Sequence, residues 1–328
     1  MSSWSGRRAL VTGAGGFIGS HLTERLVELG ASVRAMVEYD PLGSWGWLDE
    51  SPVRGEIEVR PGDVRDPDSV RSVVEAMDVV FHLAALIAIP YSYDAPQSYV
   101  ETNVLGTLNV LRAARDGGTS RVVHTSTSEV YGTARYVPID EAHPLQGQSP
   151  YAASKIGADK MAEAFHLSYG LPVATLRPFN TYGPRQSARA VIPTIITQAL
   201  SGRRIELGNT TPTRDFTFVA DTVEAFVRIA DVPEAVGRTL NIGSGKEIAI
   251  GELADRIERL IGSELPLGHD ERRVRPPGSE VERLCADVGA ASAMLGWTPS
   301  VTLDRGLAAT VEWIDNNLPR YRVGIYAV

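Results

Sequence analysis

Short β-branched runs alternate with longer amphipathic stretches through the first 178 residues of the chain. The pattern predicts strands over residues 9–13, 33–37, 57–63, 78–85, 121–126 and 172–178. It predicts helices over residues 17–29, 67–76, 97–115 and 150–169. Strands that alternate with helices are typical of βαβ units, in which parallel strands are covered by helices on both faces. We therefore predict an α/β fold built on a doubly wound parallel sheet.

After residue 178 the pattern changes to shorter strands, separate helices and a proline-rich turn. We expect residues 1–178 to form the sheet domain, with residues 212–245 returning to it. Residues 179–211 and 246–328 would then form a smaller C-terminal α/β domain. Ligands of open α/β sheets bind outside the carboxyl ends of the strands, so we expect the smaller domain to pack over that edge.

The composition is typical of a globular protein that folds without cross-links, because 43% of its residues are hydrophobic. Its one cysteine, Cys285, excludes an intramolecular disulfide, and its six histidines show no metal-ligand spacing. We find no apolar run of the ~20 residues that a membrane span needs and no signal-peptide core. A net charge of -8 disfavours nucleic-acid binding. We expect a cytoplasmic protein without a metal site.

A glycine-rich turn follows the first predicted strand in the stretch VTGAGGFIGSHL. Gly13, Gly16 and Gly19 would let a pyrophosphate approach backbone N–H groups, and Phe17 and Ile18 open a helix whose N-terminus attracts negative charge. This turn at the start of a βαβ unit predicts a dinucleotide site.

The ends of the next strands indicate which dinucleotide binds. Glu38 and Asp40 lie just beyond the second strand, where an acid favours NAD over NADP by repelling a 2′-phosphate. We also expect the cofactor to contact the end of the third strand near the adenine and small residues after the fourth strand. These residues are Asp63, Val64, Leu83, Ala84 and Ala85.

Two further segments carry candidate chemistry. The fifth strand runs into TSTSEVYG, which brings Ser126, Thr127, Ser128 and Glu129 to the carboxyl ends of the strands, the edge of the sheet where ligands bind (the ligand edge). Tyr151 and Lys155 are four residues apart and share one face of a predicted helix. A free tyrosine is a poor base at neutral pH, but a nearby ammonium and a positive nicotinamide ring would favour its phenolate.

Together with the glycine turn, this pair resembles the extended short-chain dehydrogenase/reductase superfamily over nearly the whole chain. The segments ETNVLGTLNVL, RPFNTYGPRQ, TRDFTFVAD and NIGSG resemble its nucleotide-sugar epimerase/dehydratase branch. The resemblance implies a Rossmann-like NAD-binding domain and a C-terminal domain that binds a UDP-, GDP- or dTDP-linked hexose. It also implies that Thr127, Tyr151 and Lys155 form an oxidation centre and that Asn103 lies at the cofactor. The residues that it places at the substrate are Ser126, Asn180, Arg185, Val191, Arg214 and Arg275.

The stretch TSTSEVYG resembles the active-site segment of nucleotide-sugar 4,6-dehydratases. A ketone at sugar C4 would acidify the C5 proton, which Glu129 could then remove while the C6 hydroxyl leaves as water. In the dTDP-glucose type an Asp precedes this Glu, whereas this chain has Ser128 there, as the GDP-mannose type has. The acid that protonates the leaving hydroxyl is therefore open between Glu129, Ser128 and water.

Other activities share these residues. UDP-glucuronate decarboxylases resemble the same segment, but the stretch RVRPPGSEVERLCAD lacks their arginine-rich run followed by Pro-Asp. It is closer to the legionaminic-acid type of 4,6-dehydratase, which acts on GlcNAc nucleotides. We also consider a C4 epimerase and a non-catalytic NAD-binding protein on the same fold. By resemblance, the helices near 97–115 and 150–169 imply a homodimer.

Overall fold

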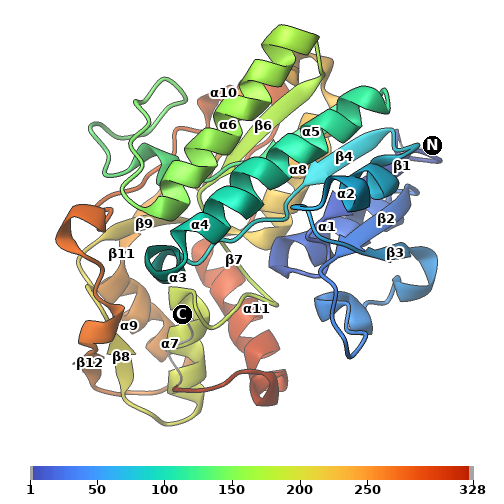
Figure 1. Cartoon of the computed structure of the whole chain (residues 1–328). Helices are drawn as coiled ribbons and strands as arrows, with labels where there is room; N and C mark the ends of the chain where they lie inside the picture. The colour runs from blue at the N-terminus through green and yellow to red at the C-terminus, as the bar shows by residue number, and fades with distance from the viewer. Residues whose placement is uncertain (1–2, 325–328) are drawn as a thin grey trace.

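The computed structural model describes residues 3–324, and its centre is a parallel sheet (Figure 1). Within this range seven strands lie in the order β10-β6-β5-β4-β1-β2-β3. All neighbouring pairs are parallel. The strands are β1 Arg8–Thr12, β2 Ser32–Val37, β3 Glu58–Pro61, β4 Val79–His82, β5 Arg121–Thr125, β6 Val173–Pro178 and β10 Thr239–Ile242. The predicted doubly wound, Rossmann-like fold is confirmed. Its strand order reverses between β1 and β4, where such folds bind ligands.

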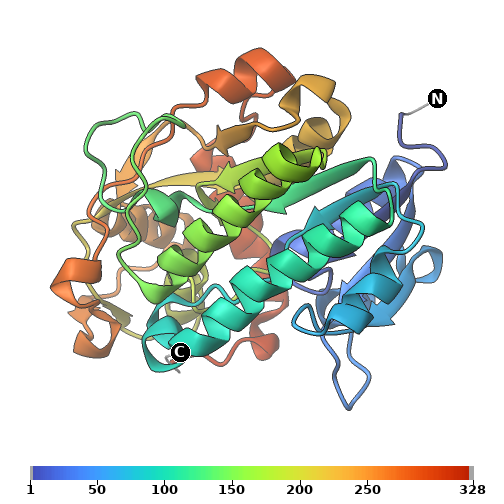
Figure 2. The same cartoon turned by 45° about the horizontal axis from the view of Figure 1, so that its top comes forward.

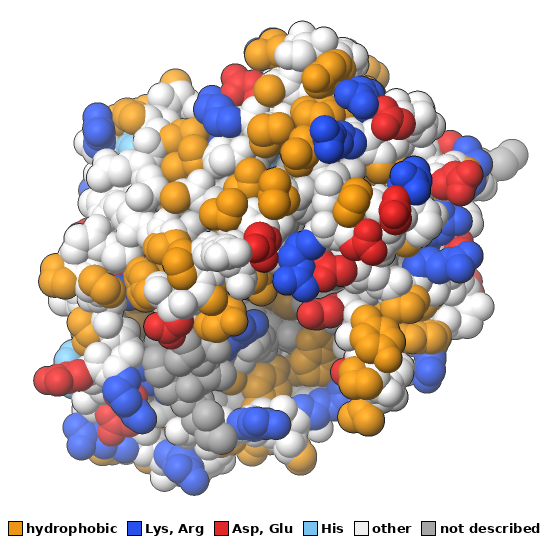
Figure 3. Space-filling model, viewed as in Figure 1, with side chains coloured by type: hydrophobic (Ala, Val, Ile, Leu, Met, Phe, Trp, Pro, Cys, Tyr) orange, Lys and Arg blue, Asp and Glu red, His pale blue; other side chains and the backbone are white. Residues whose placement is uncertain are grey.

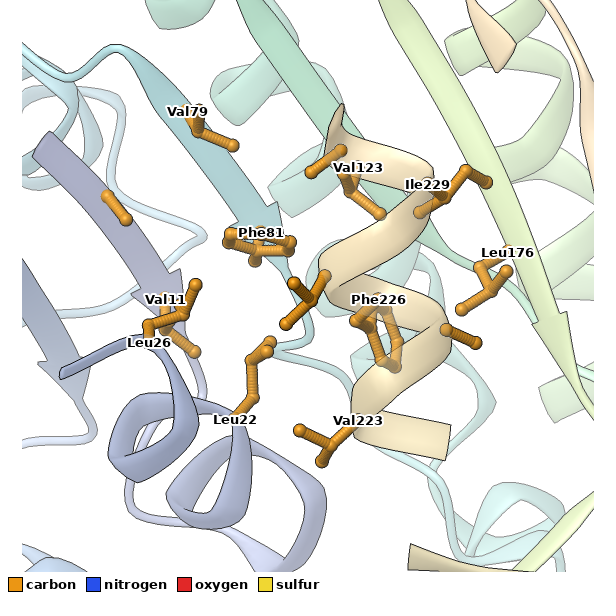
Figure 4. Close-up of a cluster of buried hydrophobic side chains, with 14 of the residues drawn as sticks. Val11, Leu22, Leu26, Val79, Phe81, Val123, Leu176, Val223, Phe226 and Ile229 are labelled. Atoms are coloured by element: carbon orange, nitrogen blue, oxygen red, sulfur yellow. The ribbon is translucent and has the colours of Figure 1, made fainter. Parts of the chain in front are cut away.

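Helices cover both faces of this sheet. On one face α1 and α8 pack apolar side chains against the strands, and Figure 4 shows Leu22 and Phe226 beside Phe81 of β4. On the other face α2, α5 and α6 enclose a second core around Leu10 and Val122. These helices are α1 Phe17–Glu28, α8 Val219–Asp231, α2 Pro67–Val74, α5 Gly106–Asp116 and α6 Pro150–Tyr169. Two enclosed faces explain why the strands are apolar on both sides.

The helix predicted over residues 97–115 is wrong in detail. The structure divides it into α4 (Pro96–Tyr99), a π-helical turn η3 (Val100–Leu105) and α5. Within the turn, the Asn103 amide is hydrogen-bonded to both backbone groups of Leu86 and to Ser154 of α6. The wider turn directs Asn103 inward, which a regular helical pattern does not reveal. The short helix α3 (Ile89–Asp94) was not predicted either.

The remaining segments form a smaller part beside the ligand edge (Figure 1). Three strands lie in the order β11-β9-β7, and β12 pairs with β8. The strands are β7 Asn180–Tyr182, β9 Thr213–Phe218, β11 Glu247–Ala249, β8 Ile205–Leu207 and β12 Leu267–His269. The helices are α7 Val191–Leu200, α9 Ile250–Ile261, α10 Gly289–Leu295 and α11 Leu303–Asn316. A core that includes Ile196, Leu253 and Leu307 holds α7, α9 and α11 together.

The surface has two features that bear on ligands and partners. Figure 3 shows a hollow between the loop that follows β2 and the part of the molecule that carries α7 and α11. Helices α5 and α6 run side by side in both views (Figures 1 and 2). In the described residues we find no helix of the length and apolar character needed to cross a membrane.

Candidate active site

The glycine-rich turn has the geometry of a phosphate site. Gly13 adopts φ +69°, and a Cβ there would lie 2.9 Å from the Ala84 nitrogen. A Cβ on Gly19 would overlap the Gly13 carbonyl oxygen. Gly16 caps α1 without a side-chain hydrogen bond, so the first N–H groups of the helix, at Phe17 and Ile18, are left for a ligand. The turn therefore fits the pyrophosphate of a dinucleotide.

The end of β4 is fixed beside this turn by Thr12. The Thr12 hydroxyl accepts hydrogen bonds from the backbone nitrogens of Leu83 and Ala84, both at 3.1 Å. It also lies 2.9 Å from Nδ1 of His82, which is buried and whose pKa is lowered by burial. Leu83, Ala84 and Ala85 are partly exposed and line the ligand edge. His82 acts as a packed strand residue, and the sequence did not reveal the role of Thr12.

The residues expected around the adenosine lie at the ends of β2 and β3. Glu38 is exposed directly after β2. Asp63 pairs with Arg65 at 2.6 Å, and the charge-assisted hydrogen bond from Arg65 lowers the pKa of Asp63. Val64 is buried, and its carbonyl accepts a hydrogen bond from Asn109. The amide oxygen and nitrogen of Asn103 are already hydrogen-bonded to Leu86 and Ser154. Asn103 therefore acts at this edge by holding the segment after β4 in place.

The tyrosine and the lysine are brought together by the start of α6. Ser149 caps the helix by accepting from the Ala152 nitrogen, and Pro150 occupies its first position. Tyr151 is 7% exposed and Lys155 is 5% exposed. The Lys155 ammonium donates to the Thr125 carbonyl at 2.6 Å, which ties the helix to the end of β5.

Burial dominates the electrostatics of this pair. It raises the pKa of Tyr151, an effect that a side-chain hydrogen bond with Thr127 opposes and the charge of Glu129 increases. Burial also lowers the pKa of Lys155 to about 8, although the charge of Asp159 acts to raise it. The protein alone therefore keeps the phenol protonated at neutral pH, and a positive charge beside it is needed to form the phenolate.

Glu129 lies in the single turn η4 (Ser128–Tyr131) that follows β5. Thr127 caps this turn by accepting a 3.3 Å hydrogen bond from the Glu129 nitrogen. Ser128 is buried, and Glu129 is only 8% exposed. The structure therefore places a buried carboxylate close enough to Tyr151 to influence its phenol.

Beneath the site, Asp159 organises a buried polar network. Its carboxylate accepts from Ser126 at 2.7 Å and from Arg177 at 2.9 Å, and it lies 3.0 Å from Nε2 of His124. Burial alone would raise the pKa of Asp159, but these hydrogen bonds and charges lower it to about 2. Because the Ser126 hydroxyl is bonded to Asp159, its expected contact with substrate stays a prediction.

A second cluster of charges faces Glu129 from the smaller part. Nη1 of Arg275 lies 4.0 Å from Oε2 of Glu129 and 3.7 Å from Oε1 of Glu280. Nη2 of Arg214 lies 3.4 Å from the same Glu280 oxygen. Burial lowers the pKa of Arg214. Glu280 was missed by sequence reasoning, although it follows Arg275 by five positions in the segment RVRPPGSE.

The other expected substrate residues have separate positions. Asn180 opens β7, and its buried Oδ1 has no hydrogen-bond partner within residues 3–324. Val191 begins α7 and is partly exposed. Arg185 forms an ion pair with Glu24 of α1 at 2.9 Å, so its contact with substrate also stays a prediction.

Comparison with known proteins agrees with this geometry. The family model described as GDP-mannose 4,6 dehydratase matches residues 10–310. A UDP-glucose 4-epimerase of Mycolicibacterium smegmatis is 37% identical, with 94% of this chain and 99% of that protein covered. A UDP-N-acetyl-alpha-D-glucosaminuronate decarboxylase of Bacillus cytotoxicus is 35% identical, with 94% and 97% covered.

Solved structures show the same likeness. The dTDP-glucose 4,6-dehydratase DesIV from Streptomyces venezuelae, solved with NAD bound, has a TM-score of 0.87. It is 32% identical, and the match covers 96% of this chain and 99% of that one. By its sequence, its fold and the arrangement of its site, the chain belongs to the GDP-mannose 4,6-dehydratase family of the extended short-chain dehydrogenases/reductases.

Proposed function

We propose that the protein is an NAD-dependent nucleotide-sugar 4,6-dehydratase acting on a GlcNAc or glucose nucleotide. The observation that carries this proposal is the buried carboxylate of Glu129, whose charge acts on the phenol of Tyr151. Of the protein's own acid and base groups, oxidation of C4 by NAD needs only the tyrosine and the lysine. A carboxylate in the same site supplies the base that elimination across C5 and C6 needs in addition.

Tyr151 and Lys155 would carry out the oxidation. NAD, when bound, supplies the hydride acceptor and later the hydride donor. The Tyr151 phenolate, which the Lys155 ammonium would stabilise, takes the proton of the C4 hydroxyl and becomes a neutral phenol. The Thr127 hydroxyl orients the phenol through the side-chain hydrogen bond between them.

Glu129 would carry out the elimination. With a ketone at C4, the carboxylate removes the C5 proton, and the electron pair forms the C5–C6 double bond as the C6–O bond breaks. The hydroxyl needs one proton to leave as water, and Glu129 has just acquired one. Ser128, which is buried next to Glu129 at the position of the missing Asp, would relay that proton. Return of a hydride to C6 and a proton to C5 gives the 4-keto-6-deoxy sugar.

The substrate would be held by the smaller part of the molecule. The unpaired Oδ1 of Asn180 is a buried acceptor that a sugar hydroxyl can satisfy. Arg214 and Arg275 offer two cations for the diphosphate. We also propose that residues 1–178 form one domain, to which α8 and β10 of the predicted returning segment 212–245 belong while β9 joins the smaller part, and that the nucleotide binds between the two domains.

A second candidate is decarboxylation of a nucleotide-linked glucuronate. Arg275, 4.0 Å from Glu129, would supply the cation that a carboxylate on C5 needs. A C4 epimerase needs no base at C5, so that reaction leaves Glu129 unused. A non-catalytic NAD-binding protein leaves Tyr151 and Lys155 unused as well.

We further propose that the enzyme is a cytoplasmic homodimer. Apolar side chains gather over α5 and α6 in Figure 3, and Leu105 and Leu167 are 46% and 74% exposed. Exposed apolar area of this kind is typical of an interface. Light scattering after size exclusion tests it, and a monomer would contradict it.

Mass spectrometry tests the activity directly. The protein is incubated with NAD and a panel of UDP-, GDP- and dTDP-hexoses, including GlcNAc nucleotides and UDP-glucuronate. Loss of water from one hexose is the expected result and names the substrate. Loss of carbon dioxide from the glucuronate assigns the site to the decarboxylase, and an unchanged mass with altered retention assigns it to an epimerase.

A further inference from the structure

Two consecutive turns of α6 hold two consecutive residues at the end of β5. Lys155 donates to the Thr125 carbonyl at 2.6 Å, and Asp159, one turn further along the helix, accepts from the Ser126 hydroxyl at 2.7 Å. The lysine and the aspartate are 5% and 6% exposed. Because the two held residues lead directly into the candidate catalytic turn η4, this double attachment fixes the turn against the helix.

Asp159 is also the counter-charge for two buried cations. Its carboxylate accepts a 2.9 Å hydrogen bond from Arg177. Burial lowers the pKa of Lys155 to about 8, and the charge of Asp159 acts against this effect. A carboxylate shared by two cations offsets part of the cost of burying them, and an ammonium that lost it would give up its proton more readily.

Other titratable side chains surround Lys155, but they do not replace this carboxylate. They are His82 of β4, His124 of β5, Glu129 of η4, Tyr151 of α6 and Arg177 of β6. Burial lowers the pKa of both histidines, so their rings are neutral at pH 7. Arg177 is a like charge that disfavours the ammonium. The charge of Glu129 acts on the phenol of Tyr151, whereas the charge of Asp159 acts on Lys155 itself.

We propose that Asp159 is a positioning residue for the oxidation step, which holds the end of β5 against α6 and supplies the counter-charge that keeps Lys155 an ammonium. The role of Asp159 rests on the functions proposed above for Tyr151 and Lys155. It does not depend on the elimination of water, because oxidation of C4 precedes that step.

The carboxylate of Asp159 lies where a small anion from solvent can reach its place. Asp159 and Arg177 line a cavity of about 280 Å³ between α6 and the strands β6 and β10. Lys160 and Glu163 line it as well, and their side chains are 61% and 54% exposed. In an Asp159→Ala variant, a formate ion that enters this cavity would find the space of the lost carboxylate and the Arg177 guanidinium.

The first measurement follows the proton of Lys155 in the NAD-free protein. The Lys155-dependent stability is the difference in unfolding free energy between a protein and its Lys155→Met variant, measured in urea over a pH series. In the wild type this difference should rise with pH between about 8 and 10.5, since the unfolded chain binds more protons there. Asp159→Asn keeps the volume and removes the charge, so the lower end of this window should move down by about one pH unit.

The second measurement follows the reaction of the NAD-loaded enzyme. The substrate is the nucleotide sugar that the wild type converts in the mass-spectrometric panel, whatever its product. At pH 8 Asp159→Asn should be about fivefold slower than the wild type, and the ratio of the two rates should shrink as the pH falls. Lys155 then regains its proton. Burial and the charge of Asp159 also raise the pKa of Tyr151, so that removing this charge favours the phenolate at low pH.

Formate separates the loss of charge from damage to the fold. Asp159→Ala should gain about fivefold in rate in sodium formate over sodium chloride of equal ionic strength, and the wild type should not respond. Glu163→Gln is the matched control, because it makes the same charge change one turn further along α6 at an exposed position of the same cavity. It should alter neither the stability window nor the rate.

The outcomes separate the role of Asp159 from the proposed function. An unchanged window of Lys155-dependent stability in Asp159→Asn would overturn the counter-charge, even if the wild type dehydrates a hexose. A rate ratio that is the same at every pH, or a folded Asp159→Ala that ignores formate, would overturn the role in oxidation. A window at lower pH together with rescue by formate supports both, even if the product shows no loss of water, a result that would refute the dehydratase alone.

Discussion

The Lys155 ammonium donates a 2.6 Å hydrogen bond to the backbone carbonyl of Thr125. This bond joins the helix that carries Tyr151 to the strand that leads to Glu129. It also keeps a cation in a buried position, where its charged form is disfavoured. The folded protein should therefore be less stable at any pH at which this cation stays charged.

Stability of the NAD-free protein should depend on the protonation of Lys155. Burial lowers its pKa from 10.5 to about 8, so between these values the unfolded chain binds more protons than the folded one. Stability therefore rises with pH through this window, by up to about 3 kcal/mol. Urea unfolding of the wild type and Lys155→Met at pH 8 and pH 10.5 checks this. The wild type should gain relative to the variant, and equal pH slopes would contradict burial as the cause.

Tyr151→Phe should abolish turnover while leaving NAD binding intact. The variant keeps the ring that packs at the site and loses only the proton acceptor, so we expect a loss of about 10²–10⁴-fold in kcat. Product formation and a fluorescence titration with NAD measure the two effects. Unchanged turnover would remove Tyr151 from the role of base.

Glu129→Gln should stop the reaction after C4 oxidation. Glutamine fills the same volume but cannot accept the C5 proton, so reduced nicotinamide accumulates and no water is lost. Absorbance follows the first step, and mass spectrometry follows the second. Full dehydration by this variant would show that another group removes the proton.

Gly19→Ala should weaken NAD binding about tenfold or more. The added Cβ would overlap the Gly13 carbonyl and force the phosphate turn open, at the 1–3 kcal/mol typical of overpacking. Gly55→Ala is the matched control, since a Cβ there meets nothing within 4 Å. Calorimetry with NAD measures both. Equal affinity in the two variants would mean that the turn relaxes without cost.

The strands and the α/β fold could be predicted because β-branched runs and glycine turns favour their local structure through residues that are adjacent in sequence. The π-helical turn could not, since it depends on Asn103 reaching Leu86 and Ser154. The Tyr151 and Lys155 pair was readable because both residues lie on one helix. Partners that meet only after folding were not readable, as the pairing of Arg185 with Glu24 shows.

The tryptophan-rich loop after β2 joins parts of the chain that are distant in sequence. The backbone N–H of Trp47 donates a hydrogen bond to the Gly15 carbonyl in the phosphate turn. The Trp47 ring packs edge-on against Trp313 of α11, with 5.2 Å between the ring centroids. Helix α11 thus supports the glycine-rich turn after β1 through Trp47. A ribosome that has made only the sheet domain has therefore not yet made a complete cofactor pocket, and full affinity for NAD should come only with the end of synthesis.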